Sequence, residues 1–160
     1  MLSPYQLKEI DEYSYGFITD KGNIYSIYFL DYSSVFSDYP KVAERIYSFN
    51  IDILEGNANR SGKDERIGIT IVEVFRLFFL KSKNVAVYVC DSLDSRQLAR
   101  KRKFDLWFWK YNDGTIIKED GIAMIEGVEI LNSLLIHKRN PNLTEIILAF
   151  KELNDRASEK

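Results

Sequence analysis

The sequence holds a single cysteine, Cys90, and a single histidine, His137. One cysteine excludes an internal disulfide and any zinc site built on several thiolates. Because only one histidine stands beside it, the chain is also short of the imidazole ligands that transition metals prefer. We therefore expect neither a disulfide nor a bound metal.

The chain also lacks an excess of charge of one sign and a long hydrophobic run. Its 22 basic and 24 acidic residues give a net charge of −2, which disfavours a nucleic-acid partner. The longest apolar stretch, Ile67 to Leu80, carries Glu73 and Arg76 and is too short to span a bilayer. The first ten residues are too polar for a secretory signal, so a cytoplasmic protein without a membrane partner is expected.

What the chain does contain is the composition of a folded domain. Hydrophobic residues make up 46% and aromatic residues 14% of the sequence, well above the content of disordered segments. No repeat, low-complexity segment or linker divides the 160 residues, so one domain spanning 1–160 is expected. A domain of this size buries roughly 70% of its unfolded surface and is stable without disulfides or metals.

Periodicity predicts three strands followed by a helix in the first half of the chain. Residues 13–19 and 24–30 are rich in Tyr, Phe and Ile, and the turn signal around Gly22 between them predicts a hairpin. Residues 46–54 alternate as a third strand with one buried face. A helix at about 65–82 should be buried on most sides, because its apolar residues nearly encircle it.

The second half begins with a short apolar run, 85–90, which predicts a central buried strand. A basic helix should follow from about Asp94. The segment 104–111 fits either a helical stripe or a β-strand. Turn signals at 113–114, 120–121 and 126–127 suit a β-meander through His137, and Asn142 with Glu145 marks the start of a last helix.

The predicted fold class is therefore α/β (α+β), with a mixed, mostly antiparallel sheet and three to four helices. The predicted order is β-β-β-α-β-α-β-β-α. Strands 46–54 and 85–90 should be parallel neighbours joined by the buried helix. Because α/β sheets usually bind ligands at the carboxyl ends of such strands, Cys90 and Asp91 are candidate catalytic residues. A buried structural cysteine, and an aspartate that caps a turn or pairs with Arg96, are the plainer alternatives.

The basic helix carries Arg96, Arg100 and Lys103 on one face, at i, i+4 and i+7. This face could meet an anion or a partner, although solvated residues or ion pairs are the simpler interpretation. The aromatic cluster Trp107 to Trp109 suits the core or a covered protein interface, and a homo-oligomer is compatible with it.

The predicted order resembles the core of the GCN5-related N-acetyltransferase superfamily. The segment Leu98-Ala-Arg-Lys-Arg-Lys-Phe104 matches the Leu, Lys and Phe of that superfamily's pattern Leu-Tyr-x-Lys-x-Gly-Phe. The resemblance implies binding of acetyl-CoA or another acyl-CoA as a small-molecule ligand, and transfer of the acyl group to an amine. The Tyr that often acts as general acid corresponds to Ala99, so the acid would come from elsewhere, such as Tyr111 or a water.

The resemblance also implies a pyrophosphate-binding turn before the buried helix. The segment 59–68 lacks the usual glycine-rich pattern but supplies suitable residue types for an anion site at a helix N-terminus. These candidate coenzyme-binding residues are Arg60, Gly62, Lys63, Arg66 and Gly68. Asp64 and Glu65 put the opposite charge in the same place, and Asp64 is the expected N-cap.

The segment Cys90-Asp-Ser-Leu-Asp-Ser-Arg-Gln-Leu-Ala-Arg100 resembles stretches in small bacterial proteins of an uncharacterised family. That resemblance implies no function. Two hypotheses of different class therefore stand: an acyl-CoA-binding protein or acyltransferase, and a non-catalytic binding or regulatory module of the same fold with a protein or nucleic-acid partner.

Overall fold

The computed structural model describes residues 2–56, 64–90 and 97–159, and it gives the backbone alone for 97–100 and 158–159. In these residues one sheet of seven strands has the order β1-β2-β3-β4-β5-β7-β6. The elements in chain order are β1 (Lys8–Asp11), β2 (Ser14–Ile18), β3 (Ile24–Asp31), η1 (Ser33–Phe36), β4 (Ile46–Glu55), α2 (Glu65–Phe78), β5 (Val85–Cys90), α3 (Gln97–Tyr111), β6 (Ile116–Ile125), β7 (Val128–His137) and α4 (Leu143–Glu159).

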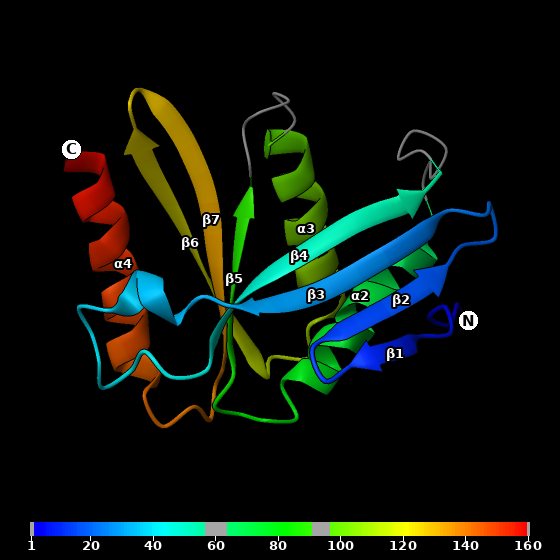
Figure 1. Cartoon of the computed structure of the whole chain (residues 1–160), viewed down its shortest axis with the longest axis horizontal. Helices are drawn as coiled ribbons and strands as arrows, with labels where there is room; N and C mark the ends of the chain where they lie inside the picture. Colours follow the sequence, from blue (N-terminus) through cyan, green and yellow to red (C-terminus); the bar gives the residue numbers. More distant parts are fainter. Residues whose placement is uncertain (1, 57–63, 91–96, 160) are drawn as a thin grey trace.

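The sheet is mixed and largely antiparallel, with helices on both of its faces (Figure 1). All neighbouring strands described pair antiparallel except β4 and β5, which pair parallel. The predicted fold class is confirmed, and so is the prediction that 46–54 and 85–90 are parallel neighbours. Strand β1 was not predicted. It pairs with β2 and so extends the sheet beyond the predicted hairpin of β2 and β3.

Side-chain alternation explains why the central strands are buried on both faces. On β5, Ala86 belongs to the core under α2 and α3, whereas Val85 and Val87 belong to the core under α4. On β7, Leu135 lies in the first core and Leu134 in the second. Successive residues of a strand point to opposite faces, so an unbroken apolar run is what a doubly covered strand requires.

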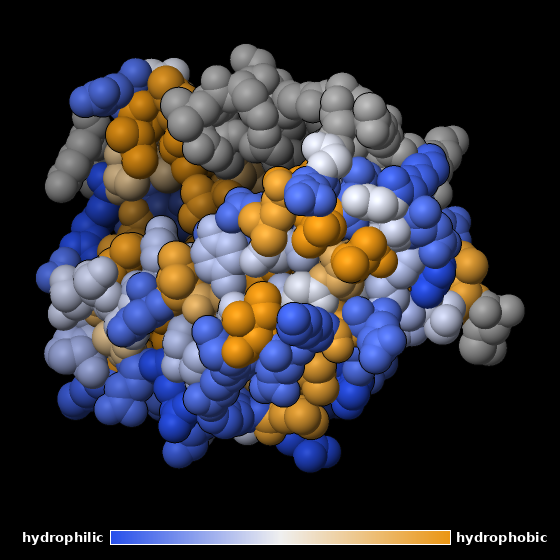
Figure 2. All heavy atoms as spheres, turned by 45° about the vertical axis from the view of Figure 1, so that its right-hand side comes forward, coloured by the Kyte–Doolittle hydropathy of each residue, from blue (hydrophilic) through white to orange (hydrophobic). Residues whose placement is uncertain are grey.

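The described helices leave most of the outer face of β1–β4 uncovered, apart from Ile46 at the start of β4, which is buried in the core with η1 and α4. Figure 2 shows hydrophobic side chains there among polar ones. Strands β2, β3 and β4 keep their inner faces in the core through residues such as Tyr15, Phe29 and Phe49, whereas all four residues of β1 are exposed. The exposed hydrophobic residues of these strands are Ile10, Ile18, Leu30 and Leu54. Ile10, Ile18 and Leu54 line one surface hollow together with Ile24, whereas Leu30 does not belong to it.

The structure settles or corrects three local predictions. Residues 104–111 are helical, as the second half of α3. The turn predicted at 120–121 is wrong, because Gly121 lies within β6, paired with Asn132 of β7. The buried helix ends at Phe78 rather than near 82, since the Asn84 side chain donates to the Phe78 carbonyl (3.0 Å) at its end.

Candidate functional site

The two parallel strands separate at their carboxyl ends. Their ladder in the described chain consists of the pairs Ile46–Val85, Tyr47–Ala86 and Ser48–Val87. Beyond Ser48, β4 continues to Glu55 alongside β3 only. Figure 1 shows β4 and β5 diverging from this point. The divergence leaves the edge of β4 from residue 49 onward without a strand partner on the β5 side, within the residues described.

Aromatic rings close the base of this divergence on the side of α3. The Phe49 and Tyr88 rings meet edge-on with centroids 5.5 Å apart, and Phe104 of α3 lies 4.5 Å from Tyr88 and 6.0 Å from Phe49. Phe104 and Phe49 are both buried. Their contact therefore separates the diverging ends of β4 and β5 from the interior between the sheet and α3.

The N-terminus of α2 lies at the same end of the sheet as the carboxyl end of β4, as expected for the helix that follows that strand. Asp64 is its N-cap, as predicted, and its Oδ1 accepts a hydrogen bond from the Arg66 backbone N–H (3.0 Å). The Tyr5 hydroxyl donates to Asp64 Oδ2 (2.5 Å). Burial and this hydrogen bond raise the pKa of Tyr5. One of the free amides that could bind phosphate is therefore already occupied by a carboxylate.

The Arg66 side chain is held by the N-terminal segment and the β2–β3 turn. Its guanidinium lies 3.9 Å from the centroid of the Tyr5 ring, and its Nε donates to the Ser3 carbonyl (2.9 Å). Its Nη1 forms an ion pair with Asp20 (3.2 Å). In this conformation Arg66 anchors residues 3–5 onto α2.

Gly68 serves the packing of α2 against α3. A Cβ atom at this position would stand 2.4 Å from Cδ1 of Trp107, which is closer than side chains tolerate. The absence of a side chain therefore lets the Trp107 ring lie directly on the backbone of α2. In the structure, Gly68 thus allows α2 and α3 to come into close contact.

The remaining candidate residues do not come together. Cys90 is buried and pairs with Leu131, whereas His137 lies six residues further along β7, about 20 Å away at strand spacing. Tyr111 ends α3, about 20 Å of helix from its first turn. Thus neither His137 nor Tyr111 lies near the carboxyl end of β5. In the described residues no three His, Cys, Asp or Glu side chains gather as a metal site.

Several candidates fall outside the described residues or side chains. Arg60, Gly62, Lys63, Asp91 and Arg96 belong to the first group, and Arg100 is described by its backbone alone. Lys103 of the predicted basic face places its ammonium 5.3 Å from the centroid of Trp107. Its charge is thus partly engaged with an aromatic face.

Sequence reasoning missed an ionic network that ties α3 to β6. Its members are Lys101 and Asp105 of α3 and Lys118 and Asp120 of β6. The Lys118 ammonium lies 2.6 Å from Asp105 and 2.5 Å from Asp120. Although burial opposes ionisation of Asp120, hydrogen bonds from Lys118 and Ser133 keep the pKa of its carboxyl below the ordinary value. The i, i+4 spacing of Lys101 and Asp105 was the available local signal.

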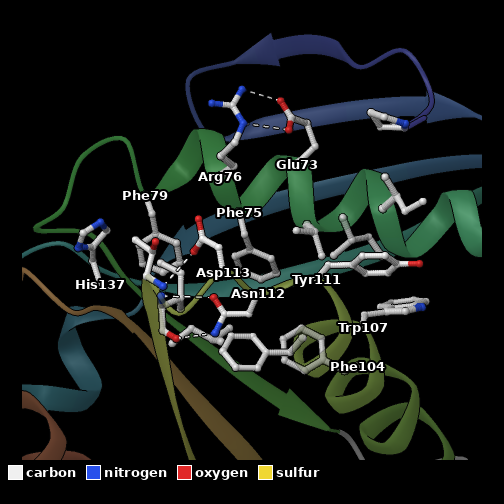
Figure 3. A pocket seen from close by; sticks show the side chains of 18 of the residues that line it. Glu73, Phe75, Arg76, Phe79, Phe104, Trp107, Tyr111, Asn112, Asp113 and His137 are labelled. Atoms are coloured by element: carbon white, nitrogen blue, oxygen red, sulfur yellow. Dashed lines mark hydrogen bonds and ion pairs between the residues drawn. The ribbon is translucent and has the colours of Figure 1, made fainter. Parts of the chain in front are cut away.

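Sequence reasoning also missed a cavity between α2 and α3, of about 470 Å³ (Figure 3). Its walls are mainly aromatic and aliphatic, and Asn112, Asp113, Thr115 and His137 provide polar groups at one end. Volumes of this size are typical of small-molecule sites. The main apolar lining residues are Ile69, Val72, Phe75, Phe79, Leu80, Phe104, Trp107, Phe108, Tyr111, Ile116 and Leu135.

Comparison with known proteins identifies the family of this α+β protein but assigns it no activity. A family of unknown function, DUF6169, matches residues 63–152. The match covers more than half of the chain, from α2 into α4, so the protein belongs to this family. This bears out the expected resemblance to an uncharacterised family. No curated protein and no solved structure matches the chain significantly. None of the described helices is long and apolar enough to cross a membrane.

Proposed function

We propose that this protein binds an acyl-coenzyme A between the diverging ends of β4 and β5, and that the site serves acyl transfer to an amine. The observation that carries the proposal is the early end of the β4–β5 ladder, after the Ser48–Val87 pair. Diverging parallel strands offer unpaired backbone groups to an extended ligand, which can add hydrogen bonds much as another strand would. The pantetheine arm of coenzyme A is such a ligand, because it carries two amide groups.

The element order around these strands gives the proposal further support. A strand, a helix, a parallel strand and a second helix follow one another as β4, α2, β5 and α3. This succession is the one expected from the acetyltransferase resemblance. The helix N-terminus that would face the pyrophosphate is that of α2.

Asp64 sets the expected affinity. A carboxylate at the N-cap stabilises the helix but repels an incoming pyrophosphate at the same place. With Arg66 held by Asp20 and the N-terminal segment, the described start of α2 offers no cation to offset this repulsion. We therefore expect weak binding by the native chain.

The catalytic acid is not a tyrosine of the first turn of α3. Ala99 occupies the position at which the acetyltransferase pattern has Tyr, and Tyr111 ends the same helix about 18 Å further on. In this proposal water protonates the departing thiolate, so acyl transfer is slow compared with enzymes that have a positioned acid.

The test is calorimetric titration of acetyl-CoA into the native protein and Asp64→Asn. Asparagine still accepts the Arg66 N–H and can hydrogen-bond the Tyr5 oxygen, so it removes the charge at little cost to the helix. We expect the variant to bind about tenfold more tightly than the native chain. Asp155→Asn, which removes an exposed carboxylate from α4, is the matched control and should bind like the native protein. Absence of binding by both the native chain and Asp64→Asn would refute the proposal.

A non-catalytic module of the same fold is the second candidate. It is favoured by the capping of α2 by Asp64 and by the engagement of Arg66, since both contacts consume groups that a coenzyme site would use. On this hypothesis neither protein binds acetyl-CoA, and the thermal unfolding midpoint of Asp64→Asn is unchanged by the coenzyme. A ligand at 100 times its Kd would otherwise stabilise by about 2.7 kcal/mol.

A further inference from the structure

The cavity between α2 and α3 is separate from the diverging strand ends. Its floor includes Phe79, Phe104 and Leu135, all nearly fully buried. Phe104 is also the ring that packs on Tyr88 at the base of the divergence. One face of this ring therefore belongs to the wall between the two regions, and a ligand in the cavity would not occupy the coenzyme position.

Aromatic side chains dominate the walls of the cavity. Trp107, Phe108 and Tyr111 reach it from α3, and Phe75 and Phe79 reach it from the end of α2 (Figure 3). The faces of aromatic rings carry partial negative charge and attract cations, most strongly where water is excluded. Such walls accept any apolar group but favour one that bears a positive charge.

The charged residues that line the cavity differ in their pairing. Arg76 and Glu73 form a two-point ion pair, with Nε–Oε2 at 2.9 Å and Nη2–Oε1 at 2.6 Å, and so neutralise each other. Figure 3 shows this pair on the outer side of α2, away from the rings, whereas Asp113 lines the polar end of the cavity next to Asn112, with its side chain exposed. Asp113 accepts the Thr115 backbone N–H (2.9 Å) and has no ion-pair partner among the residues described.

The protonation states at neutral pH reinforce this difference. Hydrogen bonds from Thr115 lower the pKa of Asp113, so it is ionised. Burial, followed by the charges of Arg139 and Lys138, lowers the pKa of His137, which is thus neutral at pH 7. Lys138 and Arg139 are exposed and do not line the cavity, although the charge of Lys138 contributes to the lowered pKa of Asp113. Among the described lining residues Asp113 is therefore the charged group without an ion-pair partner; its carboxylate is exposed at one end of the cavity, and the charge of Lys138 acts on it from outside the lining.

We propose that this cavity is a binding site for a small organic cation, an ammonium group attached to an apolar body, with the charge beside Asp113 and the body against Trp107 and Phe108. The volume of about 470 Å³ accommodates such a ligand with room for a longer apolar chain. Binding here is independent of the proposed coenzyme function.

The experiment compares three probes of one shape with different charge. The cation is benzyltrimethylammonium. Dimethylbenzylcarbinol has an uncharged carbon in place of the charged nitrogen. The anion 2,2-dimethyl-3-phenylpropanoate has a carboxylate in place of the carbinol hydroxyl and so carries the opposite charge. Each is titrated calorimetrically into the full chain. We expect the cation to bind at least tenfold more tightly than the carbinol, and the carboxylate not to bind.

Three variants locate the site. Because Asp113 is exposed, Asp113→Asn should weaken the cation only severalfold, and it should leave the carbinol unchanged, whereas Asp155→Asn on α4 should change neither. Trp107→Ala should weaken both probes, and circular dichroism shows whether each variant is folded. Equal affinities for cation and carbinol would overturn the assigned ligand class. No binding of either probe, or cation binding that Asp113→Asn leaves intact, would overturn the site itself.

Discussion

The contact between Gly68 and Trp107 predicts a substitution whose effect on stability changes sign with its neighbour. Gly68 lies in the first turns of α2, where alanine is favoured over glycine by about 1 kcal/mol of helix propensity. In the native chain, however, the new Cβ would stand 2.4 Å from Cδ1 and 2.5 Å from Nε1 of Trp107. Overpacking of this kind costs about 1–3 kcal/mol. Gly68→Ala should therefore destabilise the native protein by about 1 kcal/mol.

Removal of the indole reverses the balance. In a Trp107→Ala background the clash is absent and only the propensity gain remains, so Gly68→Ala should stabilise by about 1 kcal/mol. The coupling between the two sites is then about 2 kcal/mol, well above the error of additivity. Each kcal/mol corresponds to about 2–4 °C in Tm for a domain of this size.

Urea unfolding followed by circular dichroism at four corners of the cycle measures this coupling. Gly16→Ala is the matched control, because its Cβ would meet Tyr25 O at 3.5 Å and Ile10 Cδ1 at 3.7 Å, both ordinary contacts. Its effect should not depend on residue 107. If Gly68→Ala has the same effect in both backgrounds, the packing explanation of Gly68 is refuted, and the coenzyme-binding role implied by the acetyltransferase resemblance becomes the stronger account.

Two further substitutions test local features. Burial opposes ionisation of Asp120, but hydrogen bonds from Lys118 and Ser133 outweigh it and lower the pKa of the Asp120 carboxyl. The ionised carboxylate therefore stabilises the fold at pH values above its unfolded pKa of about 3.9, and this stabilisation is lost as the pH falls through its folded pKa. Asp120→Asn should cost about 1 kcal/mol at pH 7, and a cost that does not shrink as the pH is lowered below the unfolded pKa would contradict this. Glu126 has a φ of 50° before Gly127 at 79° in the β6–β7 turn, so Glu126→Asn should raise the free energy of unfolding by about 0.5 kcal/mol, measured in urea.

Local patterns were sufficient for the elements whose hydrogen bonds and caps are local. The β2–β3 hairpin follows from its turn, where Gly22 has a φ of 83° and donates to the Thr19 carbonyl. The Asp64 cap follows from an aspartate placed just before an apolar helical period. The parallel β4–β5 pair follows from two strands with one buried helix between them.

Contacts between residues far apart in sequence determine the two segments that periodicity left undecided or predicted wrongly. Asp120-Gly121 has the composition of a turn, but both residues stay in β6 because they pair with Ser133 and Asn132 of β7. The glycine is needed there because the Asn154 side chain of α4 occupies the space that a Cβ would fill. Residues 104–111 have both helical and β periodicity, and the aromatic contacts of Phe104 with Phe75 and Tyr88 fix the helical choice. Neither partner is adjacent in sequence, so single-sequence periodicity could not choose.

The same reason explains why the candidate site was only partly foreseen. Arg66 was expected to face an anion because the segment before α2 contains several cations. Its observed partners, Ser3, Tyr5 and Asp20, lie 46 to 63 residues away in sequence. The cavity is assembled from α2, α3 and the ends of β6 and β7, and no spacing within one element reports such a convergence.

The two proposed sites can be tested without confusing one with the other. Asp64 lies at the start of α2, whereas Asp113 follows the end of α3, and the Phe104 ring stands between the diverging strands and the cavity. The two carboxylates also act with opposite sign, since one should repel an anionic coenzyme and the other should attract an organic cation. Asp64→Asn is therefore a charge-matched control for the cation titration, and Asp113→Asn is one for the acetyl-CoA titration. If either substitution changed both affinities, the two sites could no longer be treated as independent.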